Sequence, residues 1–260
     1  MKHHRFSTLF LLSLCFILAQ GQPKVNPNVH LDTHWYPGTA TWYGEAEGDG
    51  STGGACGYGS LVDVKPLRAR VGAVGPVLYK KGEGCGECYK VKCLDHTICS
   101  KRAVTVIITD ECPGCPSDRT HFDLSGAAFG HMAVHGENGQ LRNRGEIPVL
   151  YRRTTCVYAG KNLAFQVNEG STPYWLSLLV EFEDGDGDIS SMYIQEAGSS
   201  EWLQMNHLWG ANWNIVTGPL RGPFSVKLST STGKSITVKD VIPSNWSPKS
   251  TYTSRLNFTP

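Results

Sequence analysis

The second half of the chain alternates between apolar and polar residues over several short segments. The alternation is clearest in residues 163–167, 224–228 and 236–239, and a longer apolar run spans residues 174–182. A period of two is typical of β-strands with one buried face, and turn-forming residues separate these segments. Residues 161–258 are therefore predicted to form an immunoglobulin-like β-sandwich.

The first half also contains apolar segments of strand length, including residues 103–109 and 147–151. The connections between them are rich in glycine. Every cysteine after Cys15 lies in this half of the chain. Short strands with such connections predict a compact β-barrel over residues 39–158. The fold class is thus expected to be mainly β, with two abutting domains.

The N-terminus carries the pattern of a secretory signal peptide. A basic start at residues 2–5 precedes an apolar run over residues 9–18 and a small-residue cleavage pattern at residues 19–21. Because the run is too short to span a hydrocarbon core of about 30 Å, we predict a signal peptide over residues 1–21, and no transmembrane segment. The polar residues 22–38 are predicted to form an extended or disordered arm.

Cysteine usage indicates an oxidising compartment. Removing the signal peptide removes Cys15 and leaves an even number of cysteines, which predicts four disulfides. The eight are Cys56, Cys85, Cys88, Cys93, Cys99, Cys112, Cys115 and Cys156. The two Cys-x-x-Cys pairs could instead hold zinc, but secreted thiols oxidise and nothing else in the composition requires a metal. No metal or other cofactor is expected.

The charge balance argues against a nucleic-acid partner. The formal net charge is only +1, which provides no strong attraction to nucleic acid or to an anionic membrane. Arg142, Arg144, Arg152 and Arg153 form a local basic cluster. It is expected to be a solvated face that could meet acidic pectin or glucuronate-bearing xylan.

Two acids in the first half are candidates for chemistry on a sugar. Asp110 ends an apolar strand, and Asp123 follows His121 after a cysteine-containing loop. Two carboxylates with one raised pKa are what glycoside hydrolysis requires. The alternative is that Asp123 caps the helix-like segment 124–128.

Several motifs occur together in an order that resembles a plant expansin. They are TWYG, GGACGYG, CGECYKVKC, HFDLSGAAFG, YRR, WGANW and GPFSVKL, and the TDECPGC loop is most similar to a β-expansin. The resemblance implies a six-stranded double-psi β-barrel of the family-45 endoglucanase type and a cellulose-binding sandwich. It also implies a secreted monomer of the cell wall that can associate peripherally with membrane. Such a protein loosens contacts of cellulose with xylan or xyloglucan without hydrolysis.

The resemblance also assigns residues. Thr41, Tyr43, Asp110, His121 and Asp123 would line the barrel cleft, with Asp123 at the place of the hydrolase general acid. No counterpart of the hydrolase base is expected. Some members have an acid just before GGACG, whereas this chain has Ser51 and Thr52 there, with Asp49 slightly earlier.

Four rings are implied to bind polysaccharide, namely Trp42, Tyr43, Trp175 and Trp209. Tyr174 and Trp213 lie near two of them, and one ring of each such pair is expected to point inward, with Trp175 and Trp209 outward. The implied disulfides are Cys56–Cys85, Cys88–Cys156, Cys93–Cys99 and, by remainder, Cys112–Cys115.

Smaller motifs have simpler interpretations. The Asp-Gly-Asp-Gly-Asp run at 184–188 lacks the later ligands of a calcium loop and predicts a hairpin turn. Asn245 and Asn257 begin glycosylation sequons, but each sequon is followed by proline, so inefficient use is expected. Three classes of function remain: a wall-loosening protein, a glycoside hydrolase using Asp123, and a binding module without mechanical effect.

Overall fold

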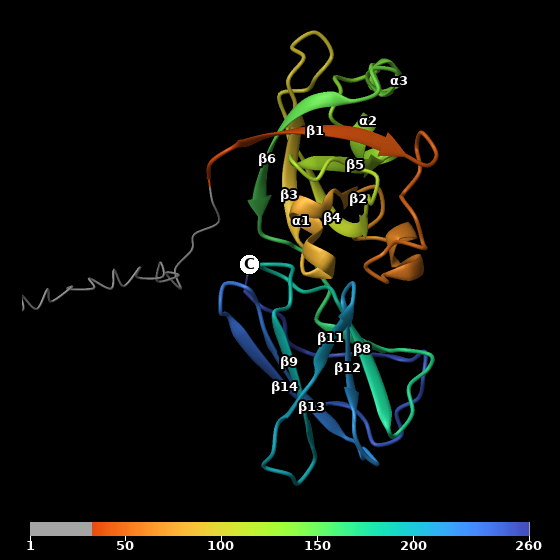
Figure 1. Cartoon of the computed structure of the whole chain (residues 1–260), viewed down its shortest axis with the longest axis vertical. Helices are drawn as coiled ribbons and strands as arrows, with labels where there is room; N and C mark the ends of the chain where they lie inside the picture. The colour runs from red at the N-terminus through yellow and green to blue at the C-terminus, as the bar shows by residue number, and fades with distance from the viewer. Residues whose placement is uncertain (1–32, 260) are drawn as a thin grey trace, which may run out of the picture.

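A computed structural model describes residues 33–259 and places two β domains end to end (Figure 1). The predicted mainly β fold class is confirmed, because a closed six-stranded barrel is followed by two packed sheets. The predicted signal peptide and most of the predicted arm lie outside the described residues. None of the helices within residues 33–259 is long and apolar enough to cross a membrane.

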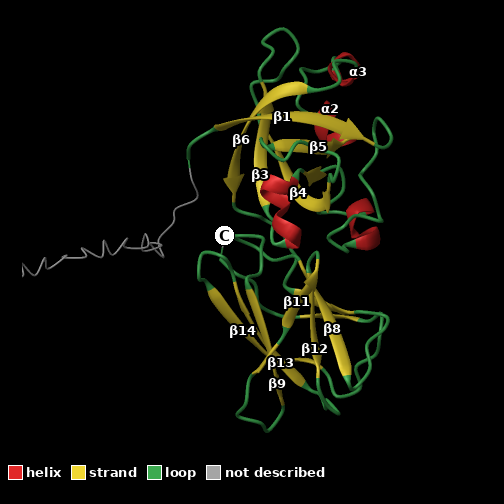
Figure 2. Cartoon of the chain, viewed as in Figure 1, coloured by secondary structure: helices red, strands yellow, loops and turns green. Residues whose placement is uncertain are grey.

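The barrel closes in the strand order β1-β5-β2-β4-β3-β6. Its first strand begins at Tyr36, within the segment predicted as an arm, because Tyr36–Gly38 pair with Tyr151–Val149 of β6. Short helices cover its ends (Figure 2). The elements are β1 (Tyr36–Tyr43), η1 (Gly59–Asp63), β2 (Val71–Val74), α1 (Pro76–Tyr79), η2 (Lys80–Gly82), β3 (Cys88–Cys93), β4 (Val104–Glu111), β5 (His121–Ser125), α2 (Gly126–Gly130), α3 (Asn138–Arg142) and β6 (Ile147–Thr154).

Alternation along the barrel strands builds two apolar layers. In β4, Val106 and Ile108 point into the barrel core beside Phe122. Ile107, between them, joins a second cluster outside the barrel with Tyr158. Since successive side chains of a strand point to opposite faces, a strand buried on both faces reads as one apolar run.

The second domain is a sandwich of two antiparallel sheets, ordered β10-β9-β13-β14 and β11-β12-β8-β7-β15. Phe165, Leu176, Ile215, Phe224 and Val226 are among the residues that fill the core between them. The strands are β7 (Ala164–Val167), β8 (Trp175–Glu181), β9 (Ser191–Glu196), β10 (Leu203–Gln204), β11 (Asn206–Trp209), β12 (Asn212–Val216), β13 (Phe224–Ser229), β14 (Ser235–Ile242) and β15 (Thr251–Thr253).

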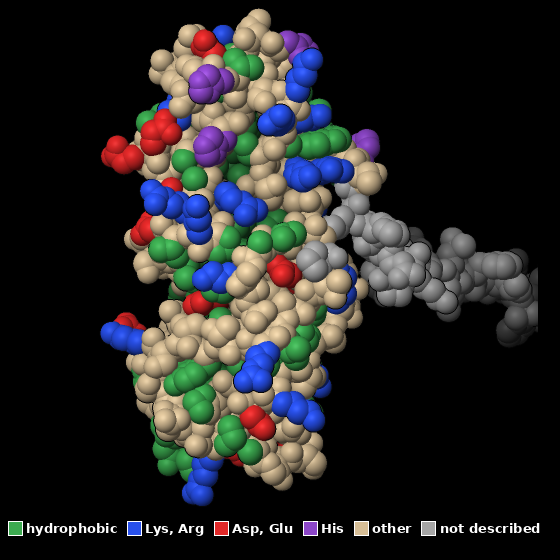
Figure 3. All heavy atoms as spheres, turned by 180° about the vertical axis from the view of Figure 1, so that it is seen from behind, with side chains coloured by type: hydrophobic (Ala, Val, Ile, Leu, Met, Phe, Trp, Pro, Cys, Tyr) green, Lys and Arg blue, Asp and Glu red, His purple; other side chains and the backbone are tan. Residues whose placement is uncertain are grey.

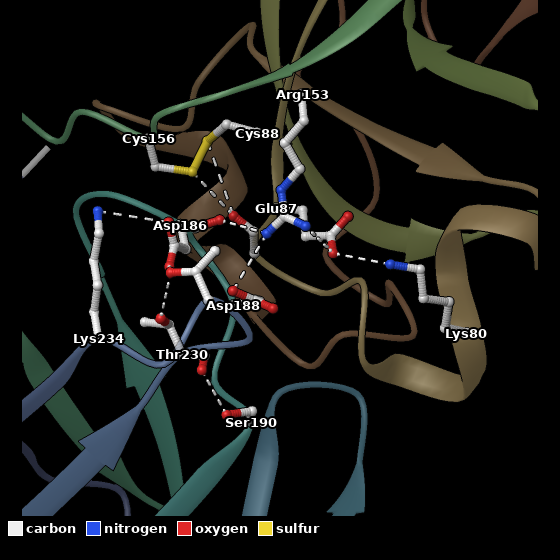
Figure 4. Close-up of polar contacts among 12 residues, drawn as sticks. Lys80, Glu87, Cys88, Arg153, Cys156, Asp186, Asp188, Ser190, Thr230 and Lys234 are labelled. Carbon is white, nitrogen blue, oxygen red and sulfur yellow. Dashed lines mark hydrogen bonds and ion pairs between the residues drawn. A yellow bond between two sulfur atoms is a disulfide. The ribbon is translucent and has the colours of Figure 1, made fainter. Parts of the chain in front are cut away.

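Arg153 of β6 holds the two domains together through a buried ion-pair network (Figure 4). Its Nη1 donates to Oε1 of Glu87 at 2.6 Å, and its Nη2 donates to the carbonyl of Asp186 at 2.7 Å. The same Nη2 lies 3.3 Å from Oδ1 of Asp188. Lys80 adds a second cation 3.3 Å from Glu87. One guanidinium thus joins a barrel carboxylate to a loop of the sandwich.

The loop that contains Asp186 is not the hairpin turn predicted for residues 184–188. It connects β8 in one sheet to β9 in the other, and its Gly185 bridges to Cys156 at the end of the barrel. Its acids therefore contribute to the contact between the two domains, which we call the seam. Nearby Glu183 is 5% exposed and lies in an interdomain cavity with Tyr58 and Tyr158. Burial raises the pKa of Glu183 to about 9.

Four disulfides tie the first domain together. They are Cys56–Cys85, Cys88–Cys156, Cys93–Cys99 and Cys112–Cys115, the same pairs that the resemblance implies. Cys88–Cys156 fixes the end of the barrel next to the seam, because Cys156 immediately precedes the interdomain connection. The two Cys-x-x-Cys pairs are thus in disulfides, and no group of three ligand side chains within residues 33–259 is placed to hold a metal ion.

Candidate functional site

The parallel pairing of β1 with β5 brings the polar residues of the candidate cleft together. Thr39 lies opposite His121, and Thr41 lies opposite Asp123. Because these positions are two apart in each strand, all four side chains share one face of the sheet. The residues between them, including Ala40 and Phe122, point into the core. Two segments about 80 residues apart in sequence thus form one polar row.

A continuous chain of hydrogen bonds runs along this row. Thr41 Oγ1 donates to Oδ1 of Asp123 at 2.7 Å and lies 2.9 Å from Nε2 of His121. Thr39 Oγ1 lies 2.7 Å from Nδ1 of the same ring. Since the single hydroxyl proton of Thr41 goes to Asp123, Nε2 carries a proton and Nδ1 accepts from Thr39. His121 is therefore the neutral Nε2–H tautomer.

Burial shifts both titratable groups of the row toward their neutral forms. His121 is only 3% exposed, and burial lowers its pKa. Asp123 is half-buried, and burial raises its pKa against the opposing effects of the Thr41 hydroxyl and His121. A polymer could reach Asp123 but not the His121 ring. His121 thus touches the row only through its contacts with Thr39 and Thr41.

Asp110 lies near Asp123 but has a different task. Ala73 of β2 pairs with Asp123 on one side and with Asp110 on the other, so the two backbones are about 10 Å apart at ordinary strand spacing. Asp110 Oδ1 accepts hydrogen bonds from the amides of Ala55 at 2.7 Å and Glu111 at 2.8 Å. Asp110 therefore anchors the loop that contains Ala55.

Tyr43 lies on the same face as the polar row, because it continues the alternation of Thr39 and Thr41 along β1. Burial, with the negative charges of Asp110 and Asp123, raises the pKa of its hydroxyl to about 12. The hydroxyl stays protonated and available as a donor. Asp49, the acid that lies slightly before GGACG in the sequence, pairs with Arg68 at 3.1 Å.

Trp209 joins the sandwich to this region of the barrel. It is 46% exposed, and a Cβ atom placed on Gly57 would lie only 2.8 Å from its Cη2. Gly57 belongs to the loop that Asp110 anchors, because its amide donates to Gly54 and Cys56 bonds to Thr109. The ring therefore rests on the barrel loop that Asp110 anchors.

Trp175 and Trp209 face outward from the same side of the five-stranded sheet. Trp175 pairs with Val216, and Trp209 pairs with Asn212. The residues next to these partners, Ile215 and Trp213, point into the sandwich core, so both rings point away from it. They lie at opposite ends of the sheet, with Trp209 beside the barrel.

Tyr174 is an exposed ring that the sequence interpretation had placed inside. Its side chain is 62% exposed, whereas Trp175 is half-buried. The expectation that one ring of this pair points inward is wrong, because Tyr174 precedes the first residue of β8 and escapes its alternation. For the other pair the expectation holds, since Trp213 is buried. Val216, 70% exposed, adds apolar surface opposite Trp175.

Trp42 and Tyr43 do not share a face. Trp42 packs against the barrel core on the side of Ala40, and its Nε1 donates to the carbonyl of Arg142 at 3.1 Å. Only Tyr43 lies on the side of Asp123. Trp42 remains partly exposed, and its contact with polysaccharide stays a prediction.

The two sequons differ in their surroundings. Asn245 is exposed. The Asn257 side chain is fully engaged, because Oδ1 accepts from the amide of Asp184 at 3.0 Å and Nδ2 donates to the carbonyl of Phe182 at 2.8 Å. Nδ2 also donates to the carbonyl of Lys161 at 3.4 Å. Both of its hydrogens are therefore engaged, and a sugar on Nδ2 would displace one of these bonds, which argues against the use of Asn257.

The fold and site define a two-domain protein, in which a closed barrel that holds the half-buried Asp123 in a polar row is joined to a β-sandwich with outward-facing rings. Sequence profiles described as lytic transglycolase and expansin C-terminal domain match residues 71–151 and 163–243. Expansin-B3 of Arabidopsis thaliana is 65% identical over 97% of both chains. Expansin-B17 of Oryza sativa subsp. japonica is 71% identical over 88% of this chain and 83% of its own. The chain belongs to the expansin family and, within it, to the expansin-B group.

Solved structures agree with this assignment. The apo expansin of Clavibacter michiganensis superposes with a TM-score of 0.67 and 26% identity, covering 87% of this chain and 99% of the bacterial one. A point mutant of the same protein, solved in complex with cellohexaose, matches with the same TM-score at 25% identity and the same coverage.

Proposed function

We propose that this protein is secreted to the plant cell wall, where it acts as a monomer that binds cellulose and loosens its contacts with xylan or xyloglucan. The observation that carries the proposal is the set of outward rings on the sandwich, of which Trp209 rests on the barrel loop that Asp110 anchors. The bacterial relative solved with cellohexaose supports a β-1,4-glucan as ligand. Tyr174, Trp175 and Trp209 would stack on the apolar faces of the glucan ribbon.

Asp123 would then face the polymer at the barrel end of this row. An ionised carboxylate is a strong acceptor for sugar hydroxyls, so it can compete for hydrogen bonds that join a glucan to its neighbours. Thr41 holds the carboxylate through Oδ1 and leaves Oδ2 without a hydrogen-bond partner within residues 33–259. Disruption of noncovalent contacts needs this acceptor and no second catalytic group.

A non-hydrolytic mechanism is supported by the state of the other acids. Hydrolysis needs a second carboxylate that is free to activate water or attack the sugar. Asp49 is paired with Arg68, and Asp110 accepts from two backbone amides. The raised pKa of Asp123 is the one feature that favours the alternative of a hydrolase with Asp123 as acid.

The purified protein tests these alternatives on heat-inactivated wall strips held under constant load. We expect creep without release of reducing ends from cellulose, xylan or xyloglucan. Sugar release in step with creep would support the hydrolase instead. Binding to cellulose without any creep would leave only a binding module.

Replacing Trp209 by alanine should weaken cellulose binding about ten- to thirty-fold. A sugar-stacked ring buries roughly 60–80 Å² of apolar surface, worth about 1.5–2 kcal/mol. The measurement is a depletion isotherm on microcrystalline cellulose, with the melting temperature as a check on folding. Trp202→Ala is the matched control, because Trp202 is a partly exposed tryptophan beside the other sheet. Equal losses in both variants would contradict the assignment of Trp209.

A further inference from the structure

The outer face of β3 and β6 carries three cations side by side. Lys90 lies directly opposite Arg152 in the antiparallel register, and Lys92 follows two residues later on the same face. The residues between them, Tyr89 and Val91, point into the barrel core. Figure 3 shows Lys and Arg side chains gathered across the barrel half of the face turned away from the viewer in Figure 1.

These cations have no acidic partner within residues 33–259, unlike the other arginines of the basic cluster noted in the sequence. Arg142 pairs with Glu47, Arg144 with Asp95, and Arg153 with Glu87 and Asp188. Three arginines of the predicted cluster are thus ion-paired with different acids, and Arg152 is the one without an acidic partner within residues 33–259. Arg152 joins the two lysines of β3 to form a different group, which we call the β3–β6 basic face.

Two further observations indicate that the basic face awaits an anion. Nε of Arg152 is buried without a hydrogen-bond partner, and an orphaned buried donor is costly. Trp35 packs against the face, with its ring centroid 4.2 Å from Nζ of Lys92 and 5.1 Å from Cζ of Arg152. The indole therefore holds two of the cations in place while leaving their charge unneutralised.

Like charges directly opposite each other on neighbouring strands destabilise a sheet. The Lys90–Arg152 pair is such an arrangement, and no acid within residues 33–259 pairs with either cation to offset the repulsion. A ligand with regularly spaced carboxylates would relieve the repulsion, engage the donors of Arg152 and bridge to Lys92. A guanidinium is well suited to carboxylate recognition because its donors form a planar fork.

We propose that the β3–β6 basic face binds a polyuronate chain, the acidic class of wall polysaccharide. The choice of a uronate polymer rests on the proposed function in the wall. The low net charge of +1 also argues against a polymer as densely charged as nucleic acid. This site is formed by β3, β6 and Trp35 and uses none of the rings assigned to cellulose.

The test uses the full mature protein and polygalacturonate as the probe, with retention measured by affinity electrophoresis at low salt. The triple variant Lys90→Gln, Lys92→Gln, Arg152→Gln should bind polygalacturonate about tenfold more weakly. Wild-type binding should fall steeply toward 1 M salt, where the screening length is about 3 Å. Binding to microcrystalline cellulose should be unchanged in the triple variant, so failure of this proposal is distinguishable from failure of the cellulose assignment.

The matched control removes the same number of charges elsewhere, through Lys65→Gln, Lys227→Gln and Lys239→Gln. We expect the control to keep wild-type affinity for polygalacturonate. An equal loss in both triple variants would mean that net charge alone attracts the polymer, and the proposal would be wrong. It would also be overturned if duplex DNA or phosphatidylserine vesicles, but not polygalacturonate, were retained through the basic face.

Discussion

Replacing Arg153 by methionine is expected to lower the free energy of unfolding by about 3–5 kcal/mol, the usual cost of removing one partner of a buried ion pair. Glu87 is almost fully buried, and Asp188 is nearly so. Without the guanidinium, their charges would face each other across the seam with Lys80 as the remaining cation near Glu87. The change should also free the loop that contains Asp186 from the barrel.

Arg152→Met provides the matched control. Arg152 is the preceding residue of β6, has a similar aliphatic stem and forms no ion pair within residues 33–259. Its replacement removes the stacking contact with Trp35 but also the repulsion from Lys90 and a buried unpaired donor, so we expect the free energy of unfolding to change by less than about 1 kcal/mol. Guanidinium chloride unfolding at pH 6 measures both variants. Superimposable curves for the two would show that Arg153 contributes nothing special to the seam.

Asp123→Asn should reduce wall creep to less than a tenth of wild type while leaving the fold intact. The amide retains an oxygen that can accept from Thr41 but loses the negative charge that makes a carboxylate a strong acceptor for sugar hydroxyls. Asp118→Asn is the control, since Asp118 is an exposed acid on the loop before β5. Full creep activity of Asp123→Asn would exclude a central role for the cleft acid.

Asp123→Asn, which should reduce creep, should keep or increase the stability of the fold. The native state raises the pKa of Asp123 above the ordinary 3.8, so it keeps a proton that the unfolded chain has already released. The free energy of unfolding of the wild type therefore falls as the pH rises from the ordinary pKa of an aspartate to the raised pKa of Asp123. Asp123→Asn removes this loss, and its melting temperature should equal or exceed that of the wild type at pH 6 while being less pH-dependent. A site that is more stable without its acid is one kept for function.

Alternation along single strands made the polar row partly predictable. Thr41, His121 and Asp123 were found from motifs, and Thr39 could have been added because it lies two residues before Thr41 in one strand. The bonds that join them were not predictable, since they depend on parallel pairing between β1 and β5 across a long stretch of chain. The same rule should have separated Trp42 from Tyr43, because neighbours in a strand point apart.

The other differences arise where tertiary contacts override local patterns. The acids at 184–188 read locally as a turn, but Arg153 from the barrel makes them part of the seam. The clustered arginines were interpreted as one solvated face, but three of them form ion pairs with acids from distant segments. Tyr174 lies just before the first residue of β8, so the alternation of side chains along the strand does not determine which way it points.

Because Trp209 rests on Gly57, the position of this sugar-stacking ring depends on both domains. The indole belongs to the sandwich, but the floor that fixes its tilt is barrel backbone in a left-handed conformation, with φ of +85°. A sandwich detached from its barrel would leave this ring free to rotate, and even one methyl group at position 57 would push it aside. The position of a bound polymer relative to Asp123 would therefore depend on the contact between Trp209 and Gly57, which requires both domains.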